Sequence, residues 1–501
     1  MAISTIFRYA HETPDKTAVV HNDGACSYAQ LAGRIEACRR HFARQDLPVG
    51  TVAVIDVECL LDAWVFGFAL RSLGLTTCAL RGPEAPGDLR VGTIGCVVTA
   101  AADNRPAPEN TFGELPWRSV CVPSDLGLAD VPIGPPEWHP AIAQPGGHIM
   151  MTSGTTGAYK RVMRSGEMET RTLPLHAEIY GMSERSVVYV SNFPLWTAGG
   201  YGWPLIAWHA GGTVIIHQGP DLHGPLLRHD ITHIFATPGT LPSLLRASNG
   251  TLRRNDASRL FVTGGALSQA TLAAAKRDLT RQVHSVLAST EMLTVAITPL
   301  DTADDLSWHR ILPSFEVQVV DEADNVLGPG IEGLVRIRIS DGPSGYLDDD
   351  ESSRRFFRDG YFHPSDVGMF GHNGRLRLCG RASDVVNVFG DKIATGPIEQ
   401  ALQDRLQADA ICIVAITRVD GNDEIYVVIQ TRQKLGPAEI EAAANATLGP
   451  LKRLPVRSVS IRELPRNLMG KIDRMELRRQ LSAAIADNVA GVRHDALARL
   501  V

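Results

Sequence analysis

The sequence predicts an α/β fold: a large N-terminal domain with a largely parallel β-sheet covered by helices, and a small α+β C-terminal domain. Through the first three hundred residues, strand-like apolar runs alternate with segments of helical spacing, which is typical of sheets covered by helices. The pattern changes near residue 310 and again after Asp384. A chain of 501 residues is also too long to pack around a single hydrophobic core of ordinary size. We therefore expect two domains, residues 1–383 and 384–501.

The N-terminal part begins with helical spacing over Tyr28–Phe42, followed by a short strand at Val52–Asp56. Strand-like runs recur at Gly212–His217, Thr232–Thr237 and Leu260–Thr263, with helical segments between them. Because each connection has room for a helix, these strands are expected to be largely parallel.

Three later regions complete the expected fold. The Pro- and Gly-rich stretch Val122–Gly147 is typical of a long surface connection. Strands are expected at Phe315–Val320 and Val335–Ile339, and the second alternates apolar residues with arginine, as a half-exposed antiparallel strand does. The C-terminal domain should contain helices at Pro397–Gln407, Ala438–Thr447 and from Asp473, and strands at Ile411–Ile416 and Ile425–Gln430.

Composition excludes several classes of protein. Apolar residues make up 44% and charged residues 21%, which is typical of a globular protein. With a net charge of −6, the chain lacks the excess of basic residues that favours binding to nucleic acid or to an anionic membrane. The longest apolar run, Ala63–Leu70, is too short for a bilayer span, and the first sixteen residues lack signal-peptide character. The eight cysteines form no CxxC pair, so we expect a cytoplasmic protein.

A candidate phosphate-binding segment follows a short apolar strand and consists of Thr152, Ser153, Gly154, Thr155, Thr156 and Gly157. Glycines let the backbone fold tightly around an anion, and the four hydroxyls supply neutral donors. Lys160 adds a mobile positive charge. The segment is not a Walker A loop, because Gly-Lys-Ser/Thr does not follow the second glycine. Taken alone, the segment is better interpreted as a surface turn rich in Ser, Thr and Gly.

Further segments point to a family. They are Ser289-Thr290-Glu291, Gly360–Asp366, Gly380–Asp384 and Leu464–Arg474. Together with the Thr152–Gly157 loop they resemble, in the same order, the motifs of the adenylate-forming superfamily: acyl- and aryl-CoA synthetases, peptide-synthetase adenylation domains and luciferases. The resemblance covers nearly the whole chain. It implies a large N-terminal domain of packed β-sheets covered by helices, hinged to a small mobile α+β C-terminal domain.

The resemblance implies roles for residues of the large domain. The Thr152–Gly157 loop and Lys160 would hold ATP phosphates, Thr290 would contact the α-phosphate, and Glu291 would bind Mg²⁺. Asp366 would accept both ribose hydroxyls, and Arg381 would contact ribose or phosphate. The backbone that lines the adenine would be Gly264, Gly265 and Ala266.

In the small domain, the resemblance implies a hinge at Asp384 and a passage for a thiol's pantetheine arm beside Gly390. Lys471 matches the superfamily's catalytic lysine, which bridges the carboxylate and the α-phosphate. Its charge would offset the negative charge that builds when one anion attacks another.

The acid pocket is expected around Ser191–Gly200, which aligns with the superfamily's acyl-binding segment. Enzymes that activate amino acids usually carry an aspartate where this chain has Asn192. The string Asn-Phe-Pro-Leu resembles that of aryl-acid activators, whereas Pro-Leu followed by Ala-Gly-Gly also resembles ordinary acyl-CoA synthetases. Aromatic side chains could wall a flat pocket, although in such a stretch they are more often core. The candidate pocket residues are Asn192, Phe193, Trp196, Gly200 and Tyr201, and we expect a small aromatic or medium-sized carboxylic acid.

The resemblance therefore implies an AMP-forming acid–thiol ligase that uses ATP and Mg²⁺, with coenzyme A as the acceptor. One alternative is a freestanding enzyme that loads a carrier protein or passes the adenylate to an amine or another nucleophile. Another is a nucleotide-binding protein that has lost catalysis. Retention of Lys160, Glu291, Asp366, Arg381 and Lys471 together argues against the last.

Overall fold

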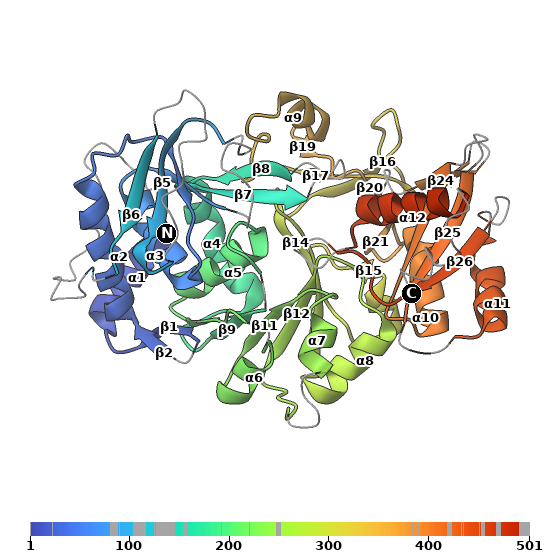
Figure 1. The fold of residues 1–501 in the computed structure, drawn as a ribbon, viewed down its shortest axis with the longest axis horizontal. Coiled ribbons are helices and arrows are strands. Elements are labelled where there is room, and N and C mark those ends of the chain that lie inside the picture. Colours follow the sequence, from blue (N-terminus) through green and yellow to red (C-terminus); the bar gives the residue numbers. More distant parts are fainter. Residues whose placement is uncertain are drawn as a thin grey trace.

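Three β-sheets make up the N-terminal part of the fold in this computed structural model (Figure 1). The structure describes the chain except residues 1, 23, 81–88, 90, 104–116, 125, 127–145, 154–158, 192, 220, 247–251, 382–384, 389–390, 418–422, 432, 434, 450, 452–455, 467–471 and 490–501.

The first sheet has eight strands and is mostly parallel. Only its two edge pairs, β14–β13 and β1–β2, are antiparallel. The order is β14 (Leu293–Pro299), β13 (Gln282–Ser289), β12 (Arg259–Thr263), β11 (His233–Ala236), β9 (Val187–Val190), β10 (Thr213–Ile216), β1 (Thr17–His21) and β2 (Gly24–Ser27). The strands predicted at 212–217, 232–237 and 260–263 are therefore confirmed, and so is their parallel direction.

The second sheet has six strands and is parallel except for its last pair, β7–β8. Its order is β6 (Arg118–Val122), β5 (Ile94–Ala100), β3 (Val52–Ile55), β4 (Thr76–Ala79), β7 (His148–Ser153) and β8 (Tyr159–Arg164). Most of the expected connection over 122–147 lies outside the described residues.

The third sheet is antiparallel and lies beside the first two. It contains β15 (Trp308–His309), β16 (Val317–Val320), β17 (Gly333–Arg338), β18 (Phe357–Arg358), β19 (Tyr361–Phe362), β20 (Asp366–Phe370) and β21 (Leu376–Arg381). Along β17, Val335 and Ile337 are buried while Arg336 and Arg338 are not, as the alternation predicted.

Helices cover these sheets and pack with them into three apolar clusters, the largest of which contains residues of the first five helices. The helices are α1 (Ala2–Glu12), α2 (Tyr28–Ala43), α3 (Leu60–Ser72), α4 (Gly166–Tyr180), α5 (Ala198–His209), α6 (Gly224–Arg228), α7 (Leu241–Arg246), α8 (Gln269–Asp278) and α9 (Asp350–Phe356). Helix α3 is buried on nearly every side, because it packs between its sheet and neighbouring helices. In its core, Trp64 stacks on Tyr201 and meets the edge of Trp208.

The C-terminal region is smaller and has its own core. Strands β22 (Val385–Val388) and β23 (Asp391–Ala394) form a hairpin, and β24 (Ala410–Thr417), β25 (Asp423–Gln430) and β26 (Val456–Ile461) form a sheet. Residues of β24 alternate between two clusters, one shared with α10 (Gly396–Leu406) and α11 (Pro437–Thr447), the other with α12 (Arg474–Val489). The predicted α+β character of this region is confirmed.

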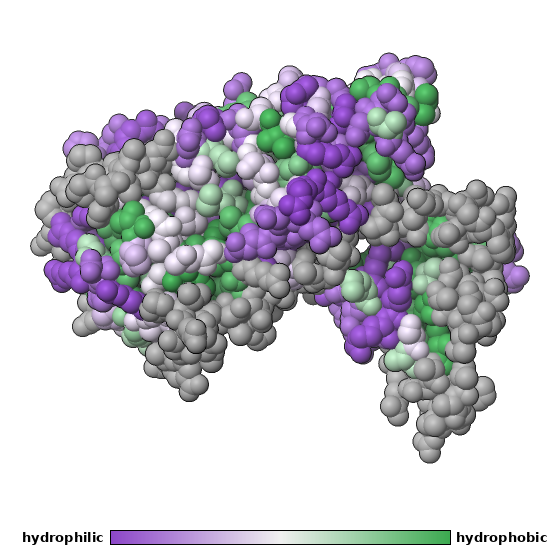
Figure 2. Space-filling model, turned by 90° about the horizontal axis from the view of Figure 1, so that it is seen from above, coloured by the Kyte–Doolittle hydropathy of each residue, from purple (hydrophilic) through white to green (hydrophobic). Residues whose placement is uncertain are grey.

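Viewed from above, the described surface carries mainly small, interleaved areas of hydrophilic and hydrophobic residues (Figure 2). Among the described helices, none has the length and apolar content needed to cross a lipid bilayer.

Candidate functional site

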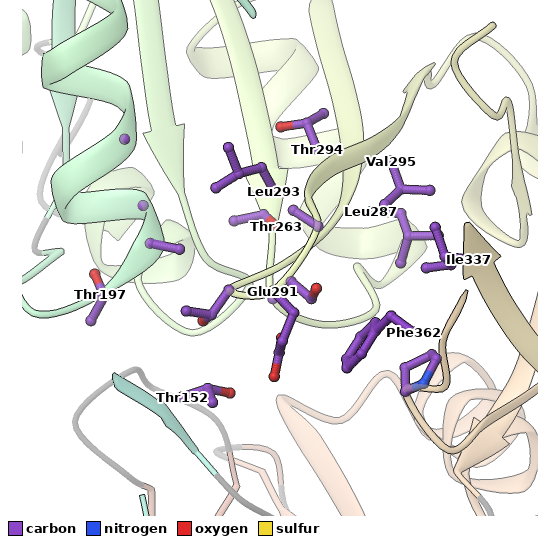
Figure 3. Close-up of a pocket in the computed structure, with 18 of the residues that line it drawn as sticks. Thr152, Thr197, Thr263, Leu287, Glu291, Leu293, Thr294, Val295, Ile337 and Phe362 are labelled. Carbon is purple, nitrogen blue, oxygen red and sulfur yellow. The ribbon is translucent and has the colours of Figure 1, made fainter. Parts of the chain in front are cut away.

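One pocket collects residues from all three N-terminal sheets and from the start of α5. In Figure 3, Glu291 reaches from the β13–β14 turn toward Thr152, and Leu287, Val295, Ile337 and Phe362 group on one side. Nine of the residues expected from the sequence line it: Thr152, Lys160, Phe193, Trp196, Gly264, Thr290, Glu291, Asp366 and Arg381.

The β7–β8 hairpin carries the described ends of the phosphate-binding segment. Thr152 and Lys160 are register partners across the two strands, and Ser153 ends β7 opposite Tyr159. Gly154, Thr155, Thr156 and Gly157 lie outside the described residues. The strand pairing therefore fixes both ends of the segment at the pocket.

Lys160 is buried against two aromatic rings. The residue has an exposed fraction of 8%, and Nζ lies 3.5 Å from the ring centroid of Phe356 and 4.8 Å from that of Tyr346. Such contacts stabilise an ammonium group that has lost water. Burial lowers the pKa of Lys160, and the carboxylates of Asp349 and Glu291 oppose that shift.

Glu291 lies at the tip of the turn between β13 and β14 and is also buried. The Tyr346 hydroxyl donates a hydrogen bond of 2.7 Å to its Oε1. Burial, followed by the adjacent Glu291 carboxylate, raises the pKa of Tyr346, so the phenol stays protonated and continues to donate. Tyr346 therefore holds the carboxylate in place and touches Lys160 with its ring.

Arg164 is hydrogen-bonded to the backbone of the turn that carries Glu291. Its guanidinium donates to the backbone carbonyl oxygens of Glu291, at 3.4 Å, and Asp341, at 3.3 Å. Burial lowers the pKa of Arg164 to about 10, a value at which the group is still charged near neutral pH. A cation in this position adds positive potential behind a site that would receive phosphates.

Asp366 and Arg381 face one another across strands β20 and β21. Arg381 Nε lies 3.3 Å from Asp366 Oδ1, and both side chains are partly exposed. An aspartate in this arrangement can accept two O–H donors while the arginine limits its movement.

The segment after β12 contributes less than expected. Gly264, with a φ of 90°, lines the pocket, and this left-handed backbone favours glycine. Gly265 and Ala266 are exposed and are not among the lining residues.

The start of α5 shapes the other end of the pocket, where Phe193 and Trp196 form part of the wall. The Thr197 hydroxyl caps the helix by accepting from the Gly200 N–H at 3.0 Å. Gly200 is not a lining residue: a Cβ there would lie 2.0 Å from the Pro194 carbonyl oxygen. Gly200 therefore allows the helix to begin against the preceding backbone.

Tyr201 corrects an expectation, because the structure places it in the core and not in the pocket wall. Its hydroxyl accepts from Arg71 and donates to Glu169, and its ring stacks on His148 with centroids 4.1 Å apart. Arg71 and Glu169 form a buried ion pair of 2.7 Å. Such a pair needs further polar partners, and Tyr201 is one of them.

Other expected residues fall where the structure gives no description. Asn192, Asp384, Gly390 and Lys471 lie outside the described residues. Their assigned roles stay predictions.

Among the residues of this site that sequence reasoning missed, four matter most for its chemistry: Arg164, His176, Tyr346 and Phe356. Tyr346 follows a Gly-Pro-Ser-Gly run, a signal of a turn that could have drawn attention. The other three sit in ordinary strand or helix patterns, which carry no mark of a pocket.

The donor set suits a magnesium ion carried by a nucleotide. Among the described residues, no three His, Cys, Asp or Glu side chains lie close enough to hold a metal together. Mg²⁺ is commonly bound by one or two carboxylates plus substrate phosphates and water. Glu291, fixed by Tyr346 at Oε1, fits that single-carboxylate arrangement.

Comparison with known proteins identifies the class. A family model described as AMP-binding enzyme matches residues 95–347, which is 253 of the 501 residues. The chain belongs to this family, so the adenylate-forming superfamily and its AMP-forming ligase chemistry, expected from the sequence, are confirmed.

Two relatives have names that refer to aromatic acids. The chain is 28% identical to a salicylyl-CoA synthase / salicylate adenylyltransferase from a Streptomyces species, over 98% of this chain and 95% of the relative. It is 26% identical to a 3-hydroxybenzoate–CoA ligase from Aromatoleum sp. strain CIB, over 94% of each. The amide bond synthetase McbA from Marinactinospora thermotolerans shares the fold, with a TM-score of 0.79, 21% identity, and coverage of 95% of this chain and 99% of that one.

Proposed function

We propose that the protein activates a small aromatic carboxylic acid with ATP and then transfers the acyl group to the thiol of coenzyme A. One observation carries this proposal: a single pocket joins Thr152, Lys160 and Glu291 to an aromatic wall containing Phe193 and Trp196. The names of two relatives, which refer to salicylate and 3-hydroxybenzoate, support an aromatic acid over an aliphatic one.

In the first step, a carboxylate oxygen attacks the α-phosphorus of ATP and pyrophosphate leaves, which gives a mixed anhydride with AMP. The protein supplies position and charge neutralisation. We assign Thr152 and Lys160, with the loop between them, to the phosphates. Thr290 would contact the α-phosphate, and Glu291 would hold Mg²⁺, which neutralises phosphate charge when bound.

The remaining nucleotide contacts follow from the same pocket. Asp366 would accept the ribose hydroxyls, and Arg381 would hold that carboxylate and contact ribose or phosphate. Gly264 would approach the adenine with its backbone. Lys471 would bridge the attacking carboxylate and the α-phosphate.

In the second step, the thiol sulfur attacks the acyl carbon, AMP leaves, and a thioester forms. We propose that residues 384–501 turn about Asp384 between the steps, which removes Lys471 and lets the thiol arm pass Gly390. No nucleophilic side chain of the enzyme is needed for either step.

Acid-dependent exchange of labelled pyrophosphate into ATP tests the first step over a panel of aromatic and medium-chain acids. Exchange with an aromatic acid is expected, and no exchange with any acid would contradict the proposal. Lys471→Ala should abolish exchange while ATP binding, measured by calorimetry, stays near the wild-type value.

The acceptor is tested separately. The enzyme and its best acid are incubated with coenzyme A, a phosphopantetheinylated carrier protein or a simple amine, and products are identified by mass spectrometry. We expect the coenzyme A thioester. If only the carrier thioester or only the amide formed, coenzyme A would not be the acceptor. The proposed adenylation step would still stand.

A further inference from the structure

His176 places an unused hydrogen-bond acceptor at the pocket. The residue lies on α4, lines the pocket and has an exposed fraction of 4%. Its Nδ1 lies 2.8 Å from the carbonyl oxygen of Thr172, one turn earlier. A carbonyl only accepts, so Nδ1 carries the proton and Nε2 of the neutral ring carries a lone pair. Among the described residues, Nε2 has no hydrogen-bond partner.

The ring is neutral under ordinary conditions. Burial lowers the pKa of His176, opposed in part by the Thr172 carbonyl, and the nearby Arg164 charge lowers it further. A second proton on Nε2 is therefore disfavoured near neutral pH, and this atom remains an acceptor.

The geometry of α4 directs this acceptor away from its own helix. Because Nδ1 is turned back toward the backbone of α4, Nε2 lies on the far side of the ring. One turn further, on the same face, Tyr180 pairs with Thr294 through a hydrogen bond of 2.6 Å between their hydroxyls. Thr294 also lines the pocket, and Figure 3 shows it with Leu293 on the side of Glu291 away from Thr152.

The pocket has unfilled space beside helix α5, which packs against α4. Gly202 of α5 lines the same pocket, and a Cβ built there would meet no atom within 4 Å. Helices α4 and α5 pack against one another, so the acceptor on α4 and the open position on α5 belong to one end of the pocket.

We propose that Nε2 of His176 accepts a hydrogen bond from a hydroxyl or amino substituent on the ring of the aryl acid. This inference rests on the proposed function and narrows its substrate to ring acids with a donor group. An acid without the donor would leave the buried acceptor unpaired, and sites built around a substrate hydroxyl reject analogues that lack it.

Matched acids test the inference on the wild-type enzyme. Pyrophosphate exchange is measured with hydroxy- and aminobenzoic acids and with methyl- and fluorobenzoic acids substituted at the same ring positions. At one ring position, the donor should raise kcat/KM about tenfold over a substituent of similar size, the factor for one hydrogen bond. Equal kcat/KM values at every ring position would overturn the inference.

Variants test the residue. His176→Phe keeps a ring of similar shape but lacks the acceptor, so the preference for the donor acid should fall about tenfold. His176→Gln places an amide near the position of Nε2 and should restore part of it. The matched control is His233→Phe, since His233 is equally buried, has both ring nitrogens bonded and does not line the pocket. This control should keep the wild-type preference.

The outcomes separate the two claims. Exchange with aromatic acids but an unchanged preference in His176→Phe would overturn the role of His176 and leave the proposed function standing. No exchange with any acid would overturn the proposed function and, with it, this inference.

Discussion

At the scale of single residues, Tyr346 links the two charges that face each other in the pocket. Its hydroxyl fixes one oxygen of Glu291, and its ring lies beside the ammonium of Lys160. The ring of Phe356 lies closer to the same ammonium group, but a phenylalanine has no group that can donate a hydrogen bond to the Glu291 carboxylate. The two aromatic residues therefore allow the hydrogen bond and the ring contact to be tested apart.

Tyr346→Phe should raise the Mg²⁺ concentration needed for half-maximal pyrophosphate exchange and lower kcat/KM for ATP about tenfold, because Glu291 loses the donor that orients it. Phe356→Leu keeps that donor and should leave the Mg²⁺ requirement near the wild-type value. Equal Mg²⁺ curves for wild type and Tyr346→Phe would contradict the role given to the hydroxyl.

The ion pair between Arg71 and Glu169 should be essential for stability. Glu169→Gln leaves a buried guanidinium without its partner, and we expect a loss of about 3–5 kcal/mol in the free energy of unfolding. Denaturant titration measures it. Glu167→Gln on the same helix removes an exposed pair with Arg171 and should cost about 1 kcal/mol or less. Similar losses in both variants would contradict the importance of burial.

At the scale of elements, the start of α5 ties helix capping to the shape of the acid pocket. Thr197 caps the helix and itself lines the pocket, as do its neighbours Trp196 and Ala198. Weakening the cap should therefore disturb substrate binding as well as stability.

Thr197→Ala should lower the free energy of unfolding by about 1 kcal/mol and raise KM for the acid. Ser27→Ala removes a comparable cap from α2, which lies outside the pocket, and should lower stability without changing that KM. Parallel changes of KM in both variants would indicate a general loss of folding instead of a local effect.

Much of the element order was predictable from the sequence, because buried parallel strands are short apolar runs bounded by turns. The runs at 232–237 and 260–263 became β11 and β12 for this reason. Sheet order was not predictable, since it depends on packing between distant segments. The motifs pointed to Lys160, but nothing local indicated that Phe356 would lie against it. Tyr201 was misassigned because an aromatic residue on a buried helix has the same local pattern in a core and in a pocket wall.

At the scale of the whole molecule, buried neutral histidines make stability depend on pH. Burial, and then the charge of Arg71, lowers the pKa of His148 to about 3. Between that value and the ordinary value near 6.5, the unfolded chain binds a proton that the native ring does not. The native state therefore loses stability as the pH falls below about 6.5.

We expect His148 to account for about 2 kcal/mol of the stability lost between pH 7.5 and pH 5. His148→Gln should be less stable at pH 7.5 but show a correspondingly shallower decline, measured by denaturant unfolding at each pH. The exposed His11 provides the control, since His11→Gln should reproduce the wild-type decline. The same decline in His148→Gln would contradict the assignment.

Because the pocket is built from three sheets, dividing the polypeptide into two separately expressed parts would also divide the site. Thr152 comes from the second sheet, Glu291 from a turn of the first and Asp366 from the third. A polypeptide that stops at residue 347, where the family match ends, would contain the first two and lack both Asp366 and Arg381. Two co-expressed halves divided there would regain activity only by reassembling, so the enzyme could report on whether two fused partner proteins bring those halves together.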